Sequence, residues 1–187
     1  MNTIYRCGKC GSYWLAGTNQ PRLLTEGELI AWLDEPQVPT ASHVAIAAHP
    51  LLTSQGWHSL SHYGKGGLYI VDAGGGIRFL ITRKLERFEL RAADERILAY
   101  WMPAPAAKRF VIMRVGEALR DLRGVDPLPQ PERLAEGFRT SVMDDGVTLS
   151  SPEKLIVVVP EADAGSLVLF SHFVDLPIDE VIARYLA

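Results

Sequence analysis

The chain has 187 residues, and 48% of them are hydrophobic, enough to bury one ordinary core with at most a small appendage. Its 19 basic and 22 acidic residues give a formal net charge of -3, which argues against a surface built to coat nucleic acid. The first residues lack the apolar segment of a secretory signal, and no run approaches the roughly 20 apolar residues that cross a bilayer. We therefore expect a cytoplasmic protein without a membrane partner, for which nucleic acid is a disfavoured partner.

The amino-terminal part of the chain predicts a hairpin, a helix and a short strand. Residues 3–6 and 13–15 are expected to form two strands, joined by a glycine-containing turn that carries both cysteines. A capping box of Thr25 and Glu28 precedes an apolar stripe and predicts a helix that ends before the next proline. Residues 44–47 are then expected to form a short strand within a proline-punctuated stretch.

Four apolar segments in the middle of the chain, separated by glycine or charged residues, predict an antiparallel meander. They are residues 68–71, 77–81, 85–90 and 97–101. The third segment also fits a helical period, so a helix stays open there while a strand is preferred. A helix is expected next, from the prolines at 103 and 105 to about Arg123, with an apolar face that includes Phe110, Val115 and Leu119.

The carboxy-terminal part predicts a hairpin, a pair of strands and a closing helix. Three prolines make residues 125–131 the best linker and a candidate internal boundary. Asp144-Asp145-Gly146 is typical of a hairpin turn, residues 155–159 of a buried strand, and residues 167–174 of its returning partner after a turn. Pro177 is expected to begin the final helix.

Together these elements predict an α+β fold, with antiparallel sheets, a few packing helices and a short amino-terminal knuckle hairpin. We expect a knuckle module over residues 1–20 and one α+β domain over residues 21–187.

The two cysteines of the chain, Cys7 and Cys10, lie on one Cys-Gly-Lys-Cys-Gly turn, where two thiolates can bind the same metal ion. This segment, over residues 4–14, resembles the knuckle of a zinc ribbon. A ribbon needs a second cysteine pair, which this sequence lacks, so a bound zinc would need other ligands to complete its tetrahedral shell. The alternatives are a metal-free knuckle held together by its aromatic residues and a redox-active thiol pair.

His58 and His62 are the natural complement to the cysteines, because residues four apart on a helical turn can reach a single ion. We predict that these two histidines complete a structural zinc site with the cysteine pair. The alternative is that both are ordinary loop residues. His43 and His49 are rival ligands with weaker spacing.

No set of residues in the sequence specifies a reaction. The glycine clusters at 64–67 and 74–76 lack the spacing of a phosphate-binding loop and predict hairpin connections instead. Neither Ser166 nor His172 belongs to a Gly-x-Ser-x-Gly nucleophile elbow. Asp72 ends an apolar strand, a position that active sites often use, but it has no visible partner in the sequence.

These observations favour a non-enzymatic protein-binding module of the immunity or adaptor type, which caps a partner protein such as a toxin. Large aromatic residues could anchor an interface if they are exposed, although for Trp101 the core is preferred; they are Trp32, Trp57, Tyr100 and Trp101. Two alternatives stay open. One is a zinc-dependent hydrolase that uses the cysteine pair, and the other is a nucleic-acid-binding protein that uses the knuckle.

Overall fold

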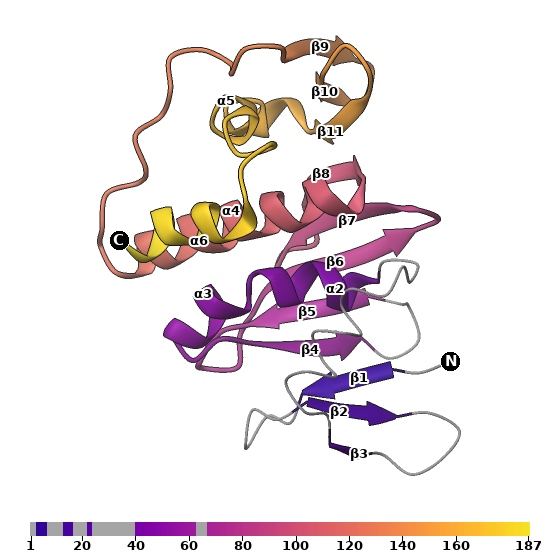
Figure 1. Ribbon diagram of the computed structural model, residues 1–187, viewed down its shortest axis with the longest axis vertical. Helices are drawn as coiled ribbons and strands as arrows, with labels where there is room; N and C mark the ends of the chain where they lie inside the picture. Colours follow the sequence, from indigo (N-terminus) through magenta and orange to yellow (C-terminus); the bar gives the residue numbers. More distant parts are fainter. Residues whose placement is uncertain (1–2, 7–12, 17–21, 24–39, 63–66) are drawn as a thin grey trace.

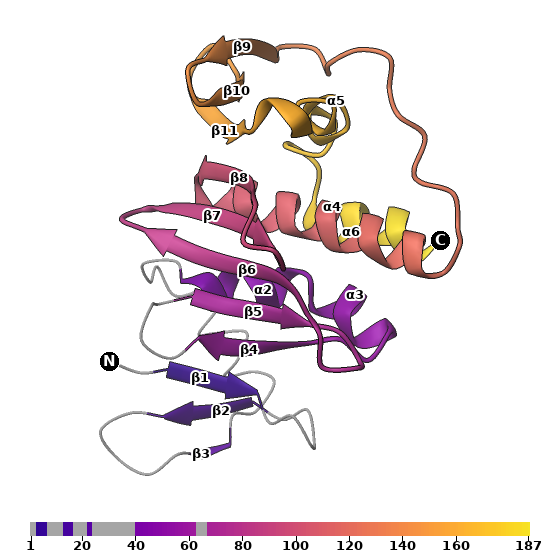
Figure 2. The ribbon, with the colours of Figure 1, turned by 180° about the vertical axis from the view of Figure 1, so that it is seen from behind.

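The computed structural model describes residues 3–6, 13–16, 22–23, 40–62 and 67–187 of the chain (Figure 1). These residues form two antiparallel sheets and a set of packing helices, which confirms the predicted α+β class. Helices α2 and α4 cover one face of the larger sheet, and the opposite face of its meander is turned toward the viewer in Figure 2. No helix in the described part of the chain is long and apolar enough to cross a membrane.

The larger sheet has eight strands in the order β4-β5-β6-β7-β8-β11-β10-β9. Every neighbouring pair is antiparallel, and the two halves of the sheet join where Val158 of β11 pairs with Tyr100 of β8. The strands are β4 His58–His62, β5 Gly67–Val71, β6 Ile77–Lys84, β7 Arg87–Ala92, β8 Ile97–Met102, β9 Arg139–Met143, β10 Gly146–Ser150 and β11 Leu155–Val159.

The smaller sheet contains the predicted amino-terminal hairpin. Strands β1 (Thr3–Arg6) and β2 (Tyr13–Ala16) pair antiparallel, and β3 (Arg22–Leu23) adds to β2. The cysteine turn and the helix expected after Thr25 lie outside the described residues. The division into a module over 1–20 and a domain over 21–187 stays a prediction.

Helix α4 is the centre of the core. It is buried on most of its circumference, because it packs against β7 and β8 on one side and against α5 and α6 on the other. Phe110 of α4 meets Phe170 of α5 edge-to-face at 4.9 Å. The helices are α2 Ala41–Ala47, α3 His49–Ser54, α4 Ala104–Leu122, α5 Ser166–Ser171 and α6 Ile178–Leu186, with a 3₁₀ turn η1 at Glu161–Asp163.

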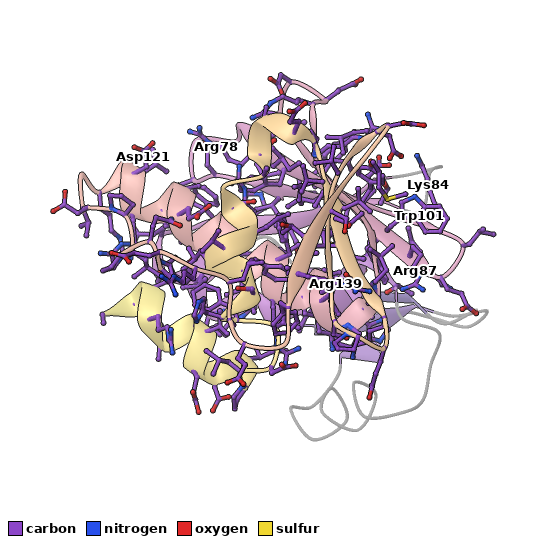
Figure 3. The ribbon with its side chains drawn as sticks, turned by 90° about the horizontal axis from the view of Figure 1, so that it is seen from above. Arg78, Lys84, Arg87, Trp101, Asp121 and Arg139 are labelled. Atoms are coloured by element: carbon purple, nitrogen blue, oxygen red, sulfur yellow. The ribbon has the colours of Figure 1, made fainter. Side chains whose placement is uncertain are left out.

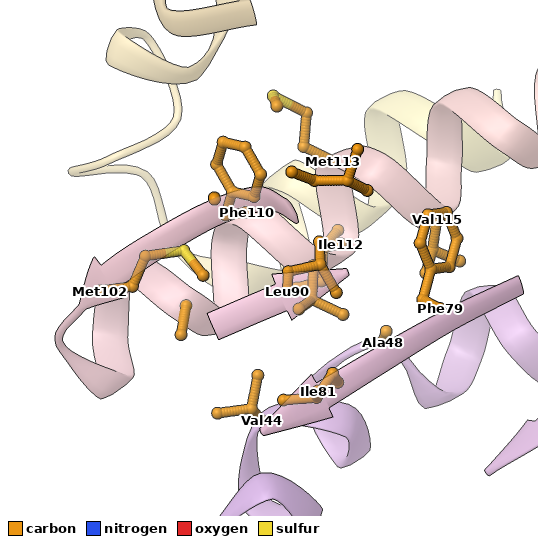
Figure 4. Packing of buried hydrophobic residues seen from close by; sticks show 14 of the residues in the cluster. Val44, Ala48, Phe79, Ile81, Leu90, Met102, Phe110, Ile112, Met113 and Val115 are labelled. Atoms are coloured by element: carbon orange, nitrogen blue, oxygen red, sulfur yellow. The ribbon is translucent and has the colours of Figure 1, made fainter. Parts of the chain in front are cut away.

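The core joins the helices to one face of the meander (Figure 4). Val44 of α2, Ile81 of β6, Leu90 of β7 and Ile112 of α4 are each at most 1% exposed and belong to the same cluster. Each such side chain contributes about 1.5–3 kcal/mol when it is fully buried. The packing fixes the meander as a rigid platform whose other face is free to carry a site.

The meander, α4, the β9–β10 hairpin, β11 and α6 all confirm the predicted elements. The ambiguous third segment is strand β7, and Leu85, expected to begin it, lies in the turn before it. Residues 125–131 carry neither helix nor strand and connect α4 to β9, as expected of a linker.

Two predicted strands are wrong. The one expected at residues 44–47 is part of α2, which begins at a capping box in which the Thr40 side chain and the backbone of His43 interact. The one expected at residues 167–174 contains α5, which lies against α4. Both segments are short apolar runs buried on several sides, and such runs fit a buried helix as well as a strand.

Candidate functional site

The face of the meander that points away from the helices is polar at its centre. Cross-strand register puts Ile81 opposite Leu90 on the core face, so the alternate residues point outward. On this outer face Lys84 lies opposite Arg87, and Glu89 lies opposite Thr82. The surface therefore concentrates ionisable side chains on strands that the core holds in place.

A pocket of about 350 Å³ opens on this outer face. It lies between the β6–β7 turn and strand β8, and its surface is mostly apolar. We call this cavity the β6–β8 pocket. Its lining residues are Lys84, Leu85, Arg87, Phe88, Glu89, Tyr100 and Trp101.

Trp101 borders the pocket and is 54% exposed, so the expectation that it lies in the core is wrong. The reason is a bulge in β8. Phe88 pairs with Met102 and Leu90 with Ala99, so Glu89 faces two residues, Tyr100 and Trp101. The backbone of Trp101 has φ 60°, a left-handed conformation that costs a non-glycine residue on the order of 1–3 kcal/mol.

Leu85, on the opposite rim of the pocket, shows the same combination of exposure and strain. Its φ is 57°, and it is 91% exposed in the two-residue turn between Lys84 and Arg87. Such turns favour Asn, Asp or Gly, because these residues tolerate a positive φ, whereas Leu gains nothing there by burial. Two exposed apolar residues in strained conformations therefore flank one pocket.

Glu89 forms the polar floor of the pocket and is held by two cations. Its carboxylate, only 8% exposed, accepts a hydrogen bond from Lys84 Nζ at 3.0 Å and one from Arg91 Nε at 2.5 Å. Burial opposes ionisation, but the two charged donors outweigh it and hold the pKa of Glu89 below its usual value. The network orders Lys84 and Arg91 before any ligand arrives.

The Arg87 side chain is exposed and makes no hydrogen bond or ion pair with the described residues, whereas the Arg87 backbone pairs with Lys84. Across residues 83–91 four basic residues accompany two acidic ones, although the whole chain is acidic. Figure 3 shows Lys84, Arg87 and Trp101 on the same side of the molecule, away from Asp121. The pocket rim is thus a locally basic surface with one uncommitted guanidinium group.

Tyr100 ties the bulge to the neighbouring hairpin. Its hydroxyl donates to the backbone carbonyl of Asp145 at 2.8 Å, in the turn between β9 and β10. Burial and this hydrogen bond raise the pKa of Tyr100 to about 12, so the phenol remains protonated and keeps donating at neutral pH. This contact helps to fix the irregular backbone on which Trp101 stands.

A second charged cluster lies on the helical side of the molecule, beside a cavity of about 450 Å³. Asp163 pairs with Arg96 at 2.9 Å and with Arg114 at 3.7 Å, and Arg114 also reaches Glu117 at 3.2 Å. Burial raises the pKa of Glu117 above its usual value, although Arg114 opposes the shift. The members of this cluster satisfy one another and link the β7–β8 turn, α4 and η1.

The predicted zinc ligands are only partly within the described residues, because Cys7 and Cys10 lie outside them. His58 and His62 are the two ends of strand β4, so the expected helical turn is wrong. Residues four apart on a strand are about 13 Å apart along it, so the spacing alone no longer brings them to one ion. No cluster of three or more His, Cys, Asp or Glu side chains in the described part could hold a metal. The zinc site stays a prediction.

The other candidate residues have structural partners. Asp72 accepts hydrogen bonds from the backbone of Gly74 and Gly76 and pairs with Arg78 at 2.7 Å, so it stabilises the β5–β6 turn. The Gly76 and Arg78 hydrogen bonds lower its pKa. His172 is the C-cap of α5, not a strand residue, and its ring contacts the carbonyl of Arg133 at 3.0 Å.

Comparison with known proteins places this fold and surface in context. The chain is similar in structure to Rv3902c from M. tuberculosis, with a TM-score of 0.60 and 17% sequence identity over 75% of this chain and 87% of that chain. A search of curated protein sequences finds no match. The family model described as Immunity protein 61 matches residues 52–187. The chain therefore belongs to the Immunity protein 61 family, and the matched residues include the whole β6–β8 pocket but not Cys7 or Cys10.

Leu85 was not among the predicted site residues, and Trp101 was expected in the core. One signal was present for Leu85, a lone apolar residue within the charged run Arg83-Lys84-Leu85-Glu86-Arg87, where a strand residue gains little by burial. The exposure of Trp101 depends on a bulge in the pairing of β7 with β8, which the alternation of either strand does not encode.

Proposed function

We propose that the protein is a non-enzymatic immunity protein that acts in the cytoplasm and caps a toxin protein through the β6–β8 pocket. Membership of the Immunity protein 61 family supports a toxin as the kind of partner. The observation that carries the site assignment is the pair of exposed, strained apolar residues, Leu85 and Trp101, on the two rims of one pocket.

Strain of this kind persists only where the surrounding structure enforces it, and it gathers at sites that bind ligands. Trp101 would gain apolar contact when a partner covers it, and tryptophan and arginine are the residues that most often dominate binding energy at protein interfaces. Arg87 supplies an uncommitted cation beside it. The two residues together have the composition of an interface centre.

The rigidity of the site also suits a protein partner. Leu85 stands on a two-residue turn and Trp101 on a bulge held by the Tyr100 hydrogen bond, so neither needs to be ordered on binding. A preorganised surface loses little conformational entropy when it docks, which favours tight capping of a toxin.

The central experiment replaces Trp101 with glycine. Trp101→Gly removes the aromatic anchor and relieves the positive φ, so we expect the free energy of unfolding to stay level or rise by about 0.5 kcal/mol. Affinity for the toxin, to be sought among toxin-like polypeptides of neighbouring genes, should fall at least about 30-fold. Urea denaturation measures the free energy of unfolding, and titration calorimetry and growth rescue on co-expression measure the loss of binding.

Leu122→Ala is the matched control, because Leu122 is 55% exposed on the far end of α4 and should not affect the affinity. Arg87→Glu should weaken binding by about tenfold, whereas Arg123→Glu, at the end of α4, should have no effect. If Trp101→Gly protects cells and binds the toxin as tightly as the unchanged protein, the site assignment is wrong. If the unchanged protein binds no toxin at all, the function is wrong.

The zinc site of Cys7, Cys10, His58 and His62 remains a separate proposal that toxin binding does not require. Metal analysis of the purified protein tests it, and the zinc content should approach one equivalent per chain if the proposal is correct. A content below about a tenth of an equivalent, with thermal stability unchanged by chelator, contradicts it.

A further inference from the structure

Strand β9 ends the larger sheet with an edge that no other strand in the described part of the chain pairs with. All five of its residues are exposed, and Val142 and Met143 are 79% and 54% exposed although both are apolar. Neither face of the strand is covered. An unpaired edge of this kind is a template for another strand.

The usual protections of an edge strand are missing from β9. Natural edges carry proline, inward-pointing charge, lysine or a bulge. The segment Arg139-Thr140-Ser141-Val142-Met143 has one charge, at its first residue, and its register with β10 runs without interruption. The strand is therefore suited to accept a partner along its full length.

The register shows which backbone groups of β9 are free. Met143 pairs with Gly146 across a two-residue turn, which makes it a hydrogen-bonded pair and makes Val142 and Val147 the next, non-hydrogen-bonded pair. The alternation then turns the backbone N–H and C=O groups of Thr140 and Val142 toward the open edge. An antiparallel ladder continues through the outward N–H and C=O groups of alternate residues, and Thr140 and Val142 provide such groups.

We infer that β9 pairs antiparallel with β9 of a second copy of this chain, about a two-fold axis through Ser141. In this register Thr140 lies opposite Val142 of the other copy, so the outward backbone groups meet, and Ser141 lies opposite its own equivalent. Arg139 lies opposite Met143 of the other copy, where its alkyl stem covers the exposed thioether.

The charges near β9 favour a second copy of this chain as the partner and an antiparallel direction of pairing. Arg139 precedes Thr140, and Asp144 follows Met143, so the edge is positive at its start and negative just beyond its end. Antiparallel self-pairing brings the positive start of each β9 near the negative turn that follows the other β9, twice across the axis, whereas parallel pairing would align like charges. Within the described residues neither Arg139 nor Asp144 makes an ion pair inside its own chain.

The contact is small, so the dimer should be weak and should form with a Kd of roughly 10–100 micromolar. Sedimentation velocity of the full chain across this range tests the proposal. Arg139→Asp and Asp144→Arg should each weaken dimerisation by about tenfold, because each reversal turns two attractive pairs into repulsive ones. The double variant, which exchanges the two charges, should regain most of the affinity.

Val142→Pro supplies a test that does not depend on charge, because it removes an outward N–H that the proposed ladder needs and leaves the pairing with β10 intact. It should abolish the dimer while circular dichroism and melting temperature remain those of the unchanged protein. A chain that stays monomeric at concentrations about tenfold above the expected Kd overturns the inference. So does a dimer that survives Val142→Pro, or one that Trp101→Gly alone abolishes, since that dimer would use the β6–β8 pocket.

The dimer and the proposed function fail separately. Trp101 and β9 are different surfaces, so a protein that neutralises its toxin but stays monomeric about tenfold above the expected Kd would end the self-pairing inference and leave the function intact. If Val142→Pro reduces toxin affinity and leaves self-association unchanged, the edge takes a strand of the toxin instead, which also overturns self-pairing.

Discussion

The two clusters of charged side chains in this protein differ in how completely their charges are paired. On the helical side, Asp163, Arg96, Arg114 and Glu117 bind one another and connect three elements. On the outer face of the meander, Glu89 is fully engaged but Arg87 has no partner among the described residues. The first arrangement has the form of a structural link, and the second leaves capacity for a ligand.

The backbone makes the same distinction. Left-handed φ values occur in the described non-glycine residues at Leu85, Trp101 and Glu95. Glu95 is an exposed polar turn residue, whereas Leu85 and Trp101 are apolar, exposed and beside the pocket. Among the described residues, backbone strain and exposed apolar side chains coincide beside the β6–β8 pocket and not at the helical cluster. We therefore assign binding to the pocket and stability to the helical cluster.

The largest expected effect is a loss of stability when Gly116, on the helical side of the molecule, is replaced. A Cβ added to Gly116 of α4 would lie 2.3 Å from the ring of Tyr185, which is 3% exposed and cannot move aside. Gly116→Ala should therefore lower the free energy of unfolding by about 2–3 kcal/mol, measured by urea denaturation. Gly165→Ala is the control, because a Cβ there meets nothing within 4 Å and should change stability by less than about 0.5 kcal/mol. Equal losses in the two variants would contradict the packing argument.

A smaller effect is expected on the outer face, where Glu89→Gln removes the carboxylate that orders Lys84 and Arg91. The variant should lose about 2 kcal/mol of stability at pH 7. Because the folded-state pKa of Glu89 is lowered, its contribution is complete above the unfolded value of about 4.3 and disappears as the pH falls through the folded pKa. Urea denaturation between pH 7 and pH 3 should show the two proteins converging in acid, and Glu86→Gln, on the exposed turn, should match the unchanged protein throughout. A constant difference at every pH would mean that the charge is not what stabilises the site.

The helical cluster provides the reverse test. Asp163→Asn weakens two ion pairs that are partly exposed, so we expect a loss of about 1 kcal/mol in stability and no change in toxin affinity. Asp121→Asn, exposed at the end of α4, is the control for removing a carboxylate. A clear loss of toxin affinity in Asp163→Asn, with the fold intact, would show that the helical cluster also contributes to toxin binding.

Sequence patterns predicted most of the fold because the meander, α4 and α6 each bury one regular set of side chains against a single core. The errors have one physical cause, since residues 44–47 and 167–174 are apolar runs buried on several sides and have no period to distinguish helix from strand. The candidate site was harder to predict from the sequence than the fold. Trp101 is exposed because of a register shift between two strands, and Glu89 is held by residues on both sides of a turn, so neither role is encoded in a local pattern. The prediction of a protein partner rested on association, because compact domains without a recognisable catalytic set often act by binding, and membership of the Immunity protein 61 family supports it.

The smallest expected effect comes from two glycine substitutions, which distinguish the role of backbone strain from the role of the leucine side chain in binding. Leu85→Gly and Glu95→Gly both place glycine at a left-handed turn position, so both should gain about 0.5 kcal/mol in stability as the strain is relieved. Only Leu85 borders the pocket, and only its replacement removes apolar surface from the rim, so Leu85→Gly alone should reduce toxin affinity, by about three- to tenfold. Parallel thermal melts and calorimetric titrations of the two variants measure this difference. An equal loss of affinity in both variants would show that backbone rigidity, rather than the leucine side chain, supports binding. Unchanged affinity in both would remove Leu85 from the site and leave Trp101 as its apolar anchor.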